Sequence, residues 1–121
     1  METSLYGKSG TEYKFTVYDI DHEFNEVPAV YVFAKAEPPL VQGLLLQTFT
    51  PLYIGKTIHL DTRMGQHERK GGKLECAKRY GASVVLVHRV VALELVADAR
   101  VKEIEDDLLG AYKTPCNIQN N

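Results

Sequence analysis

The sequence predicts a small α/β domain of the α+β type, with a mostly antiparallel central sheet flanked by helices. Strand patterns fill the first half of the chain, two helical patterns follow, and an apolar strand then precedes a long helical pattern. The length of 121 residues and the hydrophobic content of 45% suit one compact domain with its own core.

Four segments are predicted as strands, and residues 1–12 as a loose polar tail. The segments alternate bulky and polar residues or are rich in β-branched and aromatic residues, with polar residues, Gly or Pro at their ends. They are residues 13–20, 29–34, 50–54 and 83–90, with Gly55 ending the third and the fourth apolar enough to be central. Residues 41–49 are apolar and fit either a hairpin connection or a covering segment.

Three segments are predicted as helices from the spacing of their apolar residues. They are residues 58–69, with Thr57 as the N-cap, residues 74–80, and a long helix from 93 or 95 to 112. Pro115 ends the last pattern, and residues 114–121 are expected to form a polar tail.

Charge is distributed unevenly although the net charge is only −2. Residues 56–79 carry seven bases and three acids, whereas residues 1–27 and 94–107 each carry six acids and two bases. One basic segment between two acidic ones can steer a phosphate backbone to one face, although an ordinary solvated surface fits the same pattern.

The two cysteines, Cys76 and Cys116, do not belong to a CxxC pair, so neither a structural zinc site nor a redox motif is indicated. A disulfide between them is an alternative that a cytoplasmic location disfavours, so we expect two buried or half-buried thiols. The first residues lack the charged and apolar regions of a signal peptide, and no apolar run is long enough to span a bilayer. We therefore expect a cytoplasmic protein without a membrane partner.

Glu105 shares a helix face with the apolar residues Val101 and Leu108. A carboxylate on an apolar face is costly unless it is paired or binds a metal. A carboxylate at the boundary of the core, bonded to a nearby Arg, fits the pattern as well.

Arg63, Tyr31 and Tyr53 are further candidates. The Arg side chain offers planar bidentate donors that suit a phosphate, and each buried Tyr hydroxyl needs a hydrogen-bond partner. Considered one at a time, they also fit a surface Arg near Asp61 and two core aromatic residues.

The joint order of these residues resembles the GIY-YIG nuclease family. The first family motif is present as residues 29–31, with Ala29 in place of Gly, and the second is intact as residues 53–55. The family places an Arg eight residues after the second motif, a His or Tyr four residues later, and a metal-binding Glu about twelve residues before an Asn. These positions are held by Arg63, His67, Glu105 and Asn117, and Pro115 matches a Pro that commonly precedes the Asn.

The resemblance covers residues 28 to 119. It divides the chain into an N-terminal extension with an extra strand, residues 1–27, and a GIY-YIG-like nuclease domain, residues 28–121. The extra strand could extend the sheet or mediate self-association. An insertion between the motifs, residues 37–50, could shape the choice of substrate.

The resemblance implies an endonuclease that depends on Mg²⁺ or Mn²⁺ and hydrolyses phosphodiester bonds, of DNA rather than RNA. It implies that Glu105 holds the metal, that Tyr53 orients or deprotonates the attacking water, and that Tyr31 stabilises nearby charge. Arg63 would contact the scissile phosphate, and His67 would contact phosphate or assist proton movement. Contacts to nucleic acid are expected from Lys56, His59, Arg69, Lys70 and Lys73, and structural roles from Gly55 and Asn117.

Other functions stay open at this point. The chain could be a GIY-YIG-like binding module without catalysis, or an interaction protein, because no separate DNA-binding domain is evident. A homodimer or a partner protein could supply specificity. An enzyme acting on a nucleoside triphosphate is disfavoured, since the sequence has no Gly-rich phosphate loop.

Overall fold

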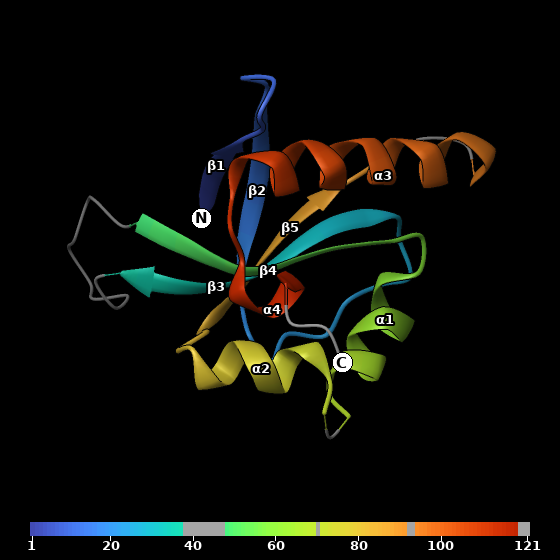
Figure 1. The fold of residues 1–121 in the computed structure, drawn as a ribbon. Helices are drawn as coiled ribbons and strands as arrows, with labels where there is room; N and C mark the ends of the chain where they lie inside the picture. Colours follow the sequence, from blue (N-terminus) through green and yellow to red (C-terminus); the bar gives the residue numbers. More distant parts are fainter. Residues whose placement is uncertain (38–47, 70, 92–93, 119–121) are drawn as a thin grey trace.

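The structure, a computed structural model, describes residues 1–37, 48–69, 71–91 and 94–118. Five strands form one curled antiparallel sheet, a half-barrel, with helices packed on it (Figure 1). The order of strands across the sheet is β1-β2-β5-β3-β4. The elements are β1 (Glu2–Tyr6), β2 (Glu12–Asp19), β3 (Ala29–Glu37), β4 (Thr48–Thr57), α1 (Leu60–His67), α2 (Lys73–Arg79), β5 (Val84–Arg89), α3 (Glu94–Ala111) and α4 (Pro115–Ile118).

Helices cover both faces of the sheet, as Figure 1 shows, with α3 on one side and α1 and α2 on the other. Side chains alternate between the faces along β3. Val30 and Val32 belong to the core that includes Ile104 of α3. Tyr31 and Phe33 belong to the second core, with residues of α1, α2 and α4. β3 is therefore buried on both faces, and Tyr31 points toward the α1 and α2 layer.

Most of the predicted elements are confirmed. The α+β class is correct, and every strand pair is antiparallel. β5 is central as predicted, because it pairs with both β2 and β3. The extra strand expected in the N-terminal extension is β2. None of the helices in the described part of the chain is long and apolar enough to cross a membrane.

The prediction of a loose tail over residues 1–12 is wrong. β1 pairs with β2 through a hairpin, and Leu5 is buried in the core beside α3. The hairpin turn contains Gly10 at a φ of +88°, which favours glycine. The polar composition hid the buried Leu5 and the turn residue Gly10, and the backbone N–H groups of Lys8 and Ser9 also bind Asp107 of α3.

Two predicted boundaries around the second motif are also wrong. β4 continues past Gly55 to Thr57, because Gly55 pairs with Tyr31 of β3 inside the sheet. Thr57 does not cap α1: the helix begins at Leu60, and the Thr57 hydroxyl accepts the backbone N–H of His59 at 2.9 Å. Residues 41–47 of the apolar segment lie outside the described residues, and residues 48 and 49 belong to β4.

The expectation of two free thiols is wrong as well. Cys76 of α2 and Cys116 of α4 form a disulfide, with their Cα atoms 5.9 Å apart. The short helix α4 was not predicted, since Pro115 was assigned to end a helix. It starts one instead, at the first helical position that proline favours. Because disulfides are rare in cytosolic proteins, the cytoplasmic location stays a prediction.

Candidate functional site

Three of the predicted site residues, Tyr31, Arg63 and His67, form one hydrogen-bonded cluster between β3 and α1. The Tyr31 hydroxyl lies 2.5 Å from His67 Nε2 and accepts the Arg63 Nε–H at 3.3 Å. Since its oxygen accepts from Arg63, the Tyr31 hydroxyl has its own proton to donate to His67. We call Tyr31, Tyr53, Arg63 and His67 the tyrosine cluster. Tyr31 on β3 is thus brought into contact with Arg63 and His67 on α1, which lie 32 and 36 positions later in the sequence.

The protonation of the cluster follows from its burial. Burial, helped by the charges of Arg63 and Lys73, lowers the pKa of His67 to about 4, so the ring is neutral near pH 7. Burial raises the pKa of Tyr31 well above its ordinary value, so this hydroxyl keeps its proton. A neutral imidazole has one nitrogen free to accept, which matches a hydrogen bond donated by Tyr31.

Tyr53 completes the cluster on β4. Its ring stacks on Phe33 with centroids 5.7 Å apart and meets the His67 ring edge-on at 5.2 Å. The Lys73 Nζ lies 6.0 Å from the centroid of the Tyr53 ring, within cation–π range. The Tyr53 hydroxyl is close enough to influence the pKa values of both Tyr31 and Arg63.

Gly55 has a steric role that the structure makes explicit. It pairs with Tyr31 across the sheet, and a Cβ at Gly55 would lie 2.4 Å from both the hydroxyl oxygen and Cζ of Tyr31. Real Cβ contacts do not come this close. Only glycine at this position lets the Tyr31 ring lie over β4 and reach His67 and Arg63.

A polar groove opens beside the cluster. Its volume is about 370 Å³, and it is lined by Lys56, Thr57, His59, Thr62, Arg63 and Gln66. Arg63 therefore belongs to both: its Nε–H is held by Tyr31 in the cluster, while the rest of its guanidinium borders the groove. Lys56 and His59, two of the expected nucleic-acid contacts, lie on the same groove.

Gln66 and Glu26 are contributors that sequence reasoning missed. Gln66 Oε1 accepts an N–H of Arg63 at 2.9 Å, and its spacing of three residues on one helix is the signal that could have found it. Glu26 accepts the backbone N–H of Thr62 at 2.8 Å and its hydroxyl at 2.6 Å, which ties the N-terminal extension to α1. No spacing rule links Glu26 to Thr62, because the contact is tertiary.

Glu105 lies apart from the hydrogen-bonded cluster. It is half-buried on α3, which covers the opposite face of the sheet, but it is near enough to Lys56 and Arg63 for their charges to act on it. Burial raises the pKa of Glu105, whereas the positive charges of Lys56 and Arg63 act to lower it. Within the described part of the chain, no hydrogen bond or ion pair engages its carboxylate. A half-buried, unengaged carboxylate facing positive charge is a suitable ligand for a hard cation.

Asn117 binds the outer edge of β4 between the two key residues of the second motif. Its Oδ1 accepts the Ile54 N–H at 2.7 Å, and its Nδ2 donates to the Ile54 carbonyl at 2.9 Å. The Thr114 hydroxyl donates to the same Oδ1 at 2.5 Å. This geometry supports the structural role expected for Asn117, because it satisfies both backbone groups of Ile54 where the sheet ends.

The remaining predicted contacts differ in position. Lys73 begins α2 beside the cluster, and Arg69 is exposed just beyond the end of α1. Lys70 lies outside the described residues. His59 immediately precedes α1 and is 4.0 Å from the Glu26 carboxylate.

A closed metal site of the usual kind is not present in the described ranges, where no three His, Cys, Asp or Glu side chains converge. A family model, a characterised protein or a solved structure that matches this chain was not found.

Proposed function

We propose that this chain is a divalent-metal-dependent endonuclease with a GIY-YIG-like fold, which hydrolyses phosphodiester bonds of nucleic acid, DNA rather than RNA. The observation that carries the proposal is the tyrosine cluster. Residues chosen from the motif order alone lie in contact with one another, and Gly55 of the second motif makes room for the tyrosine of the first. In a core that had nothing to do with the motif pattern, these particular residues would not need to lie in contact.

Arg63 is the residue we assign to the scissile phosphate. A guanidinium has five N–H donors; Tyr31 and Gln66 accept from two of them, and the Tyr53 hydroxyl is close enough to interact with the group as well. The other donors border the polar groove and suit bidentate binding of a phosphate. Tyr31, Gln66 and His67 are then positioning residues, since they hold Arg63 in one orientation before substrate arrives.

Tyr53 is the residue we assign to the attacking water. The Tyr31 hydroxyl is already engaged by His67 and Arg63 and the residue is 0% exposed, whereas Tyr53 keeps 7% of its surface exposed, so Tyr31 is the less suited to contact a water molecule. Tyr53 lies in the same cluster, with the Lys73 Nζ 6.0 Å from the centroid of its ring. His67, whose pKa is lowered to about 4, is neutral near pH 7 and a weak base, so it fixes the Tyr31 hydroxyl by accepting its hydrogen bond.

Glu105 fits a site for Mg²⁺ or Mn²⁺. Mg²⁺ keeps most of its water ligands and needs only one or two protein carboxylates, so a single Glu is sufficient. When bound, such an ion supplies charge stabilisation at the phosphate. Lys56 and the groove around it would hold the neighbouring phosphates of the strand.

Replacement of Arg63 by Lys tests this assignment. Lys keeps the positive charge but loses the planar donors that Tyr31 and Gln66 hold, so we expect cleavage to fall by about 10²–10³-fold. Binding of the same DNA, measured by fluorescence anisotropy in Ca²⁺, should change far less. Arg69→Lys, on the exposed residue beyond α1, is the matched control and should retain cleavage. Equal cleavage by Arg63→Lys would exclude Arg63 from the reaction, and binding without any cleavage by wild type would favour a binding module.

A further inference from the structure

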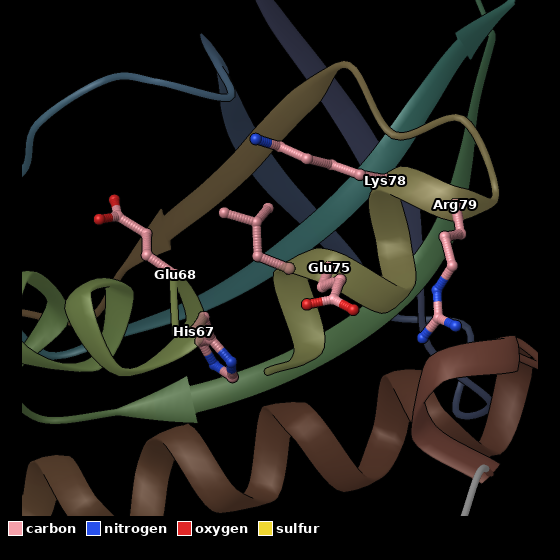
Figure 2. A pocket seen from close by; sticks show the side chains of 6 residues that line it. His67, Glu68, Glu75, Lys78 and Arg79 are labelled. Atoms are coloured by element: carbon pink, nitrogen blue, oxygen red, sulfur yellow. The ribbon is translucent and has the colours of Figure 1, made fainter. Parts of the chain in front are cut away.

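A second cavity lies between α1 and α2, and of its lining residues only His67 takes part in the mechanism described above. Figure 2 shows it, with His67 and Glu68 at the C-terminal end of α1 and Glu75, Lys78 and Arg79 on α2. Its volume is about 360 Å³, and Leu74 completes its lining. We call it the α1–α2 cavity. It lies within the size range of small-ligand sites in proteins.

The two helices are held close together by the turn that joins them. A Cβ at Gly72 would lie 2.5 Å from the carbonyl oxygen of His67, so this approach requires glycine. Cys76 of α2 is also bonded to Cys116 of α4. The helices that line the cavity are therefore held in place by the close contact at Gly72 and by the disulfide.

The charges in the α1–α2 cavity are opposite in sign but do not pair with one another. Glu68 and Glu75 contribute two carboxylates, and Lys78 and Arg79 contribute two cations, all exposed. Among the described residues, no ion pair joins any of the four, and Glu75 alone is engaged, by the Gly71 N–H at 3.0 Å. The cavity thus offers acceptors and donors together, which suits a ligand that carries both an anionic group and N–H donors.

The inner wall of the α1–α2 cavity joins it to the tyrosine cluster. Leu74 is nearly buried and gives an apolar surface, and His67 is the residue whose Nε2 bonds Tyr31. His67 is only 4% exposed, and it lines the cavity while bonding Tyr31, one helical turn from Arg63 on α1. A ligand in the cavity would therefore lie near a phosphate bound by Arg63.

We propose that the α1–α2 cavity binds an unstacked nucleobase that carries an exocyclic amino group, next to the phosphodiester bond that is cut. Carboxylates accept hydrogen bonds from the amino groups of guanine, adenine or cytosine, a donor that thymine lacks. Lys78 supplies a cation for the phosphate of the same nucleotide. The apolar wall of Leu74 replaces part of the lost base stacking. This assignment rests on the proposed function for its biological meaning, but the binding itself does not require cleavage.

The substrate class follows from the cost of unstacking. Extruding a base from a perfect duplex costs a few kcal/mol, and the cost is lowest for a mismatched or single-stranded base. The enzyme should therefore prefer DNA with an unpaired guanine, adenine or cytosine at the cleavage site over fully paired DNA.

The test uses mononucleotides and the full chain, so that binding is read without cleavage. dGMP, dAMP, dCMP and dTMP are titrated into the labelled protein, with inorganic phosphate as a separate titration, and amide NMR shifts are followed. We expect shifts confined to the residues around the α1–α2 cavity, with dTMP and phosphate bound at least roughly fivefold more weakly than dGMP. The double variant Glu68→Ala, Glu75→Ala removes both acceptors and should remove this preference while still binding phosphate, and Asp98→Ala on α3 should leave it unchanged.

The outcomes separate the two proposals. Equal binding of all four nucleotides and of phosphate would overturn the nucleobase assignment and leave a simple phosphate patch. Shifts elsewhere on the protein, or none, would overturn it also. Base-selective binding at the cavity by a protein that cuts neither paired nor mismatched DNA would support the nucleobase assignment and contradict the nuclease.

Discussion

At the scale of single residues, Gly55 links the sequence motif to the packing of the site. Gly55 has no side chain, and the Tyr31 ring fills the space where one would lie. A Cβ at Gly55 would be 2.4 Å from Cζ and from the hydroxyl oxygen of Tyr31. In Gly55→Ala, the buried Tyr31 ring or β4 must move, which should destabilise the fold by about 1–3 kcal/mol. Because Arg63 is held by the displaced hydroxyl, cleavage should fall on the order of 10²-fold even in the fraction that is folded.

Gly65 provides the control for this prediction. It lies in α1, and a Cβ there meets no atom within 4 Å. Gly65→Ala should therefore be neutral or more stable by about 0.5–1 kcal/mol, because alanine favours the helix. Urea unfolding of both variants measures the difference. Equal stability of the two would show that Tyr31 does not lie against Gly55.

His67 leads to a prediction about pH. Its pKa is about 4 in the folded protein, below its ordinary value near 6.5, so the unfolded chain takes up more protons between these values. The contribution of His67 to stability is therefore present above pH 6.5 and is lost as the pH falls toward 4. His67→Gln removes this titration, so the difference in urea midpoint between wild type and variant should shrink across that window. A difference that does not change with pH would contradict the buried, neutral ring.

At the scale of elements, the four-residue helix α4 connects helix α2 to strand β4. The disulfide between Cys76 and Cys116 attaches it to α2, and Asn117 attaches it to β4 beside Tyr53 and Gly55. The bridge closes a loop with a sequence separation of 40 residues, which corresponds to about 4 kcal/mol in the chain-entropy model. Reduction should lower the free energy of unfolding by up to this amount.

The measurement is urea unfolding with and without a thiol reductant. The double variant Cys76→Ser, Cys116→Ser should be as unstable as the reduced wild type and insensitive to the reductant. Thiol titration of the unreduced, unfolded chain should find no free thiol. Two free thiols in that titration would show that the bridge does not form.

At the scale of the whole molecule, charge is separated between layers. The basic segment contributes α1 and α2, while the acidic segment forms much of α3 on the opposite face of the sheet. Two of the acids on α3 are paired with bases of the same helix, Glu103 with Arg100 and Asp106 with Lys102. A phosphate backbone is thus attracted to the face where α1 and α2 lie.

The sequence predicted the α+β class and the central strand because long periodic segments carry a strong pattern. It failed for β1 and α4, which depend on tertiary contacts: Leu5 in the core, and a disulfide with an amide clamp. Motif order was sufficient to select Tyr31, Arg63 and His67, but it did not reveal their hydrogen bonds or the reason for Gly55. Gln66 was accessible from its spacing to Arg63, whereas the contact of Glu26 with α1 was not.

The most direct test of the central claim is nicking of supercoiled plasmid in Mg²⁺ by wild type and by Glu105→Gln. Glu103→Gln, two positions earlier on α3, controls for the loss of a carboxylate from this helix. The nuclease proposal predicts nicking by wild type and Glu103→Gln, loss of that nicking with EDTA, and none with Glu105→Gln. Equal nicking by Glu105→Gln, or no metal-dependent cutting by wild type of plasmid, mismatched or single-stranded DNA, would contradict it.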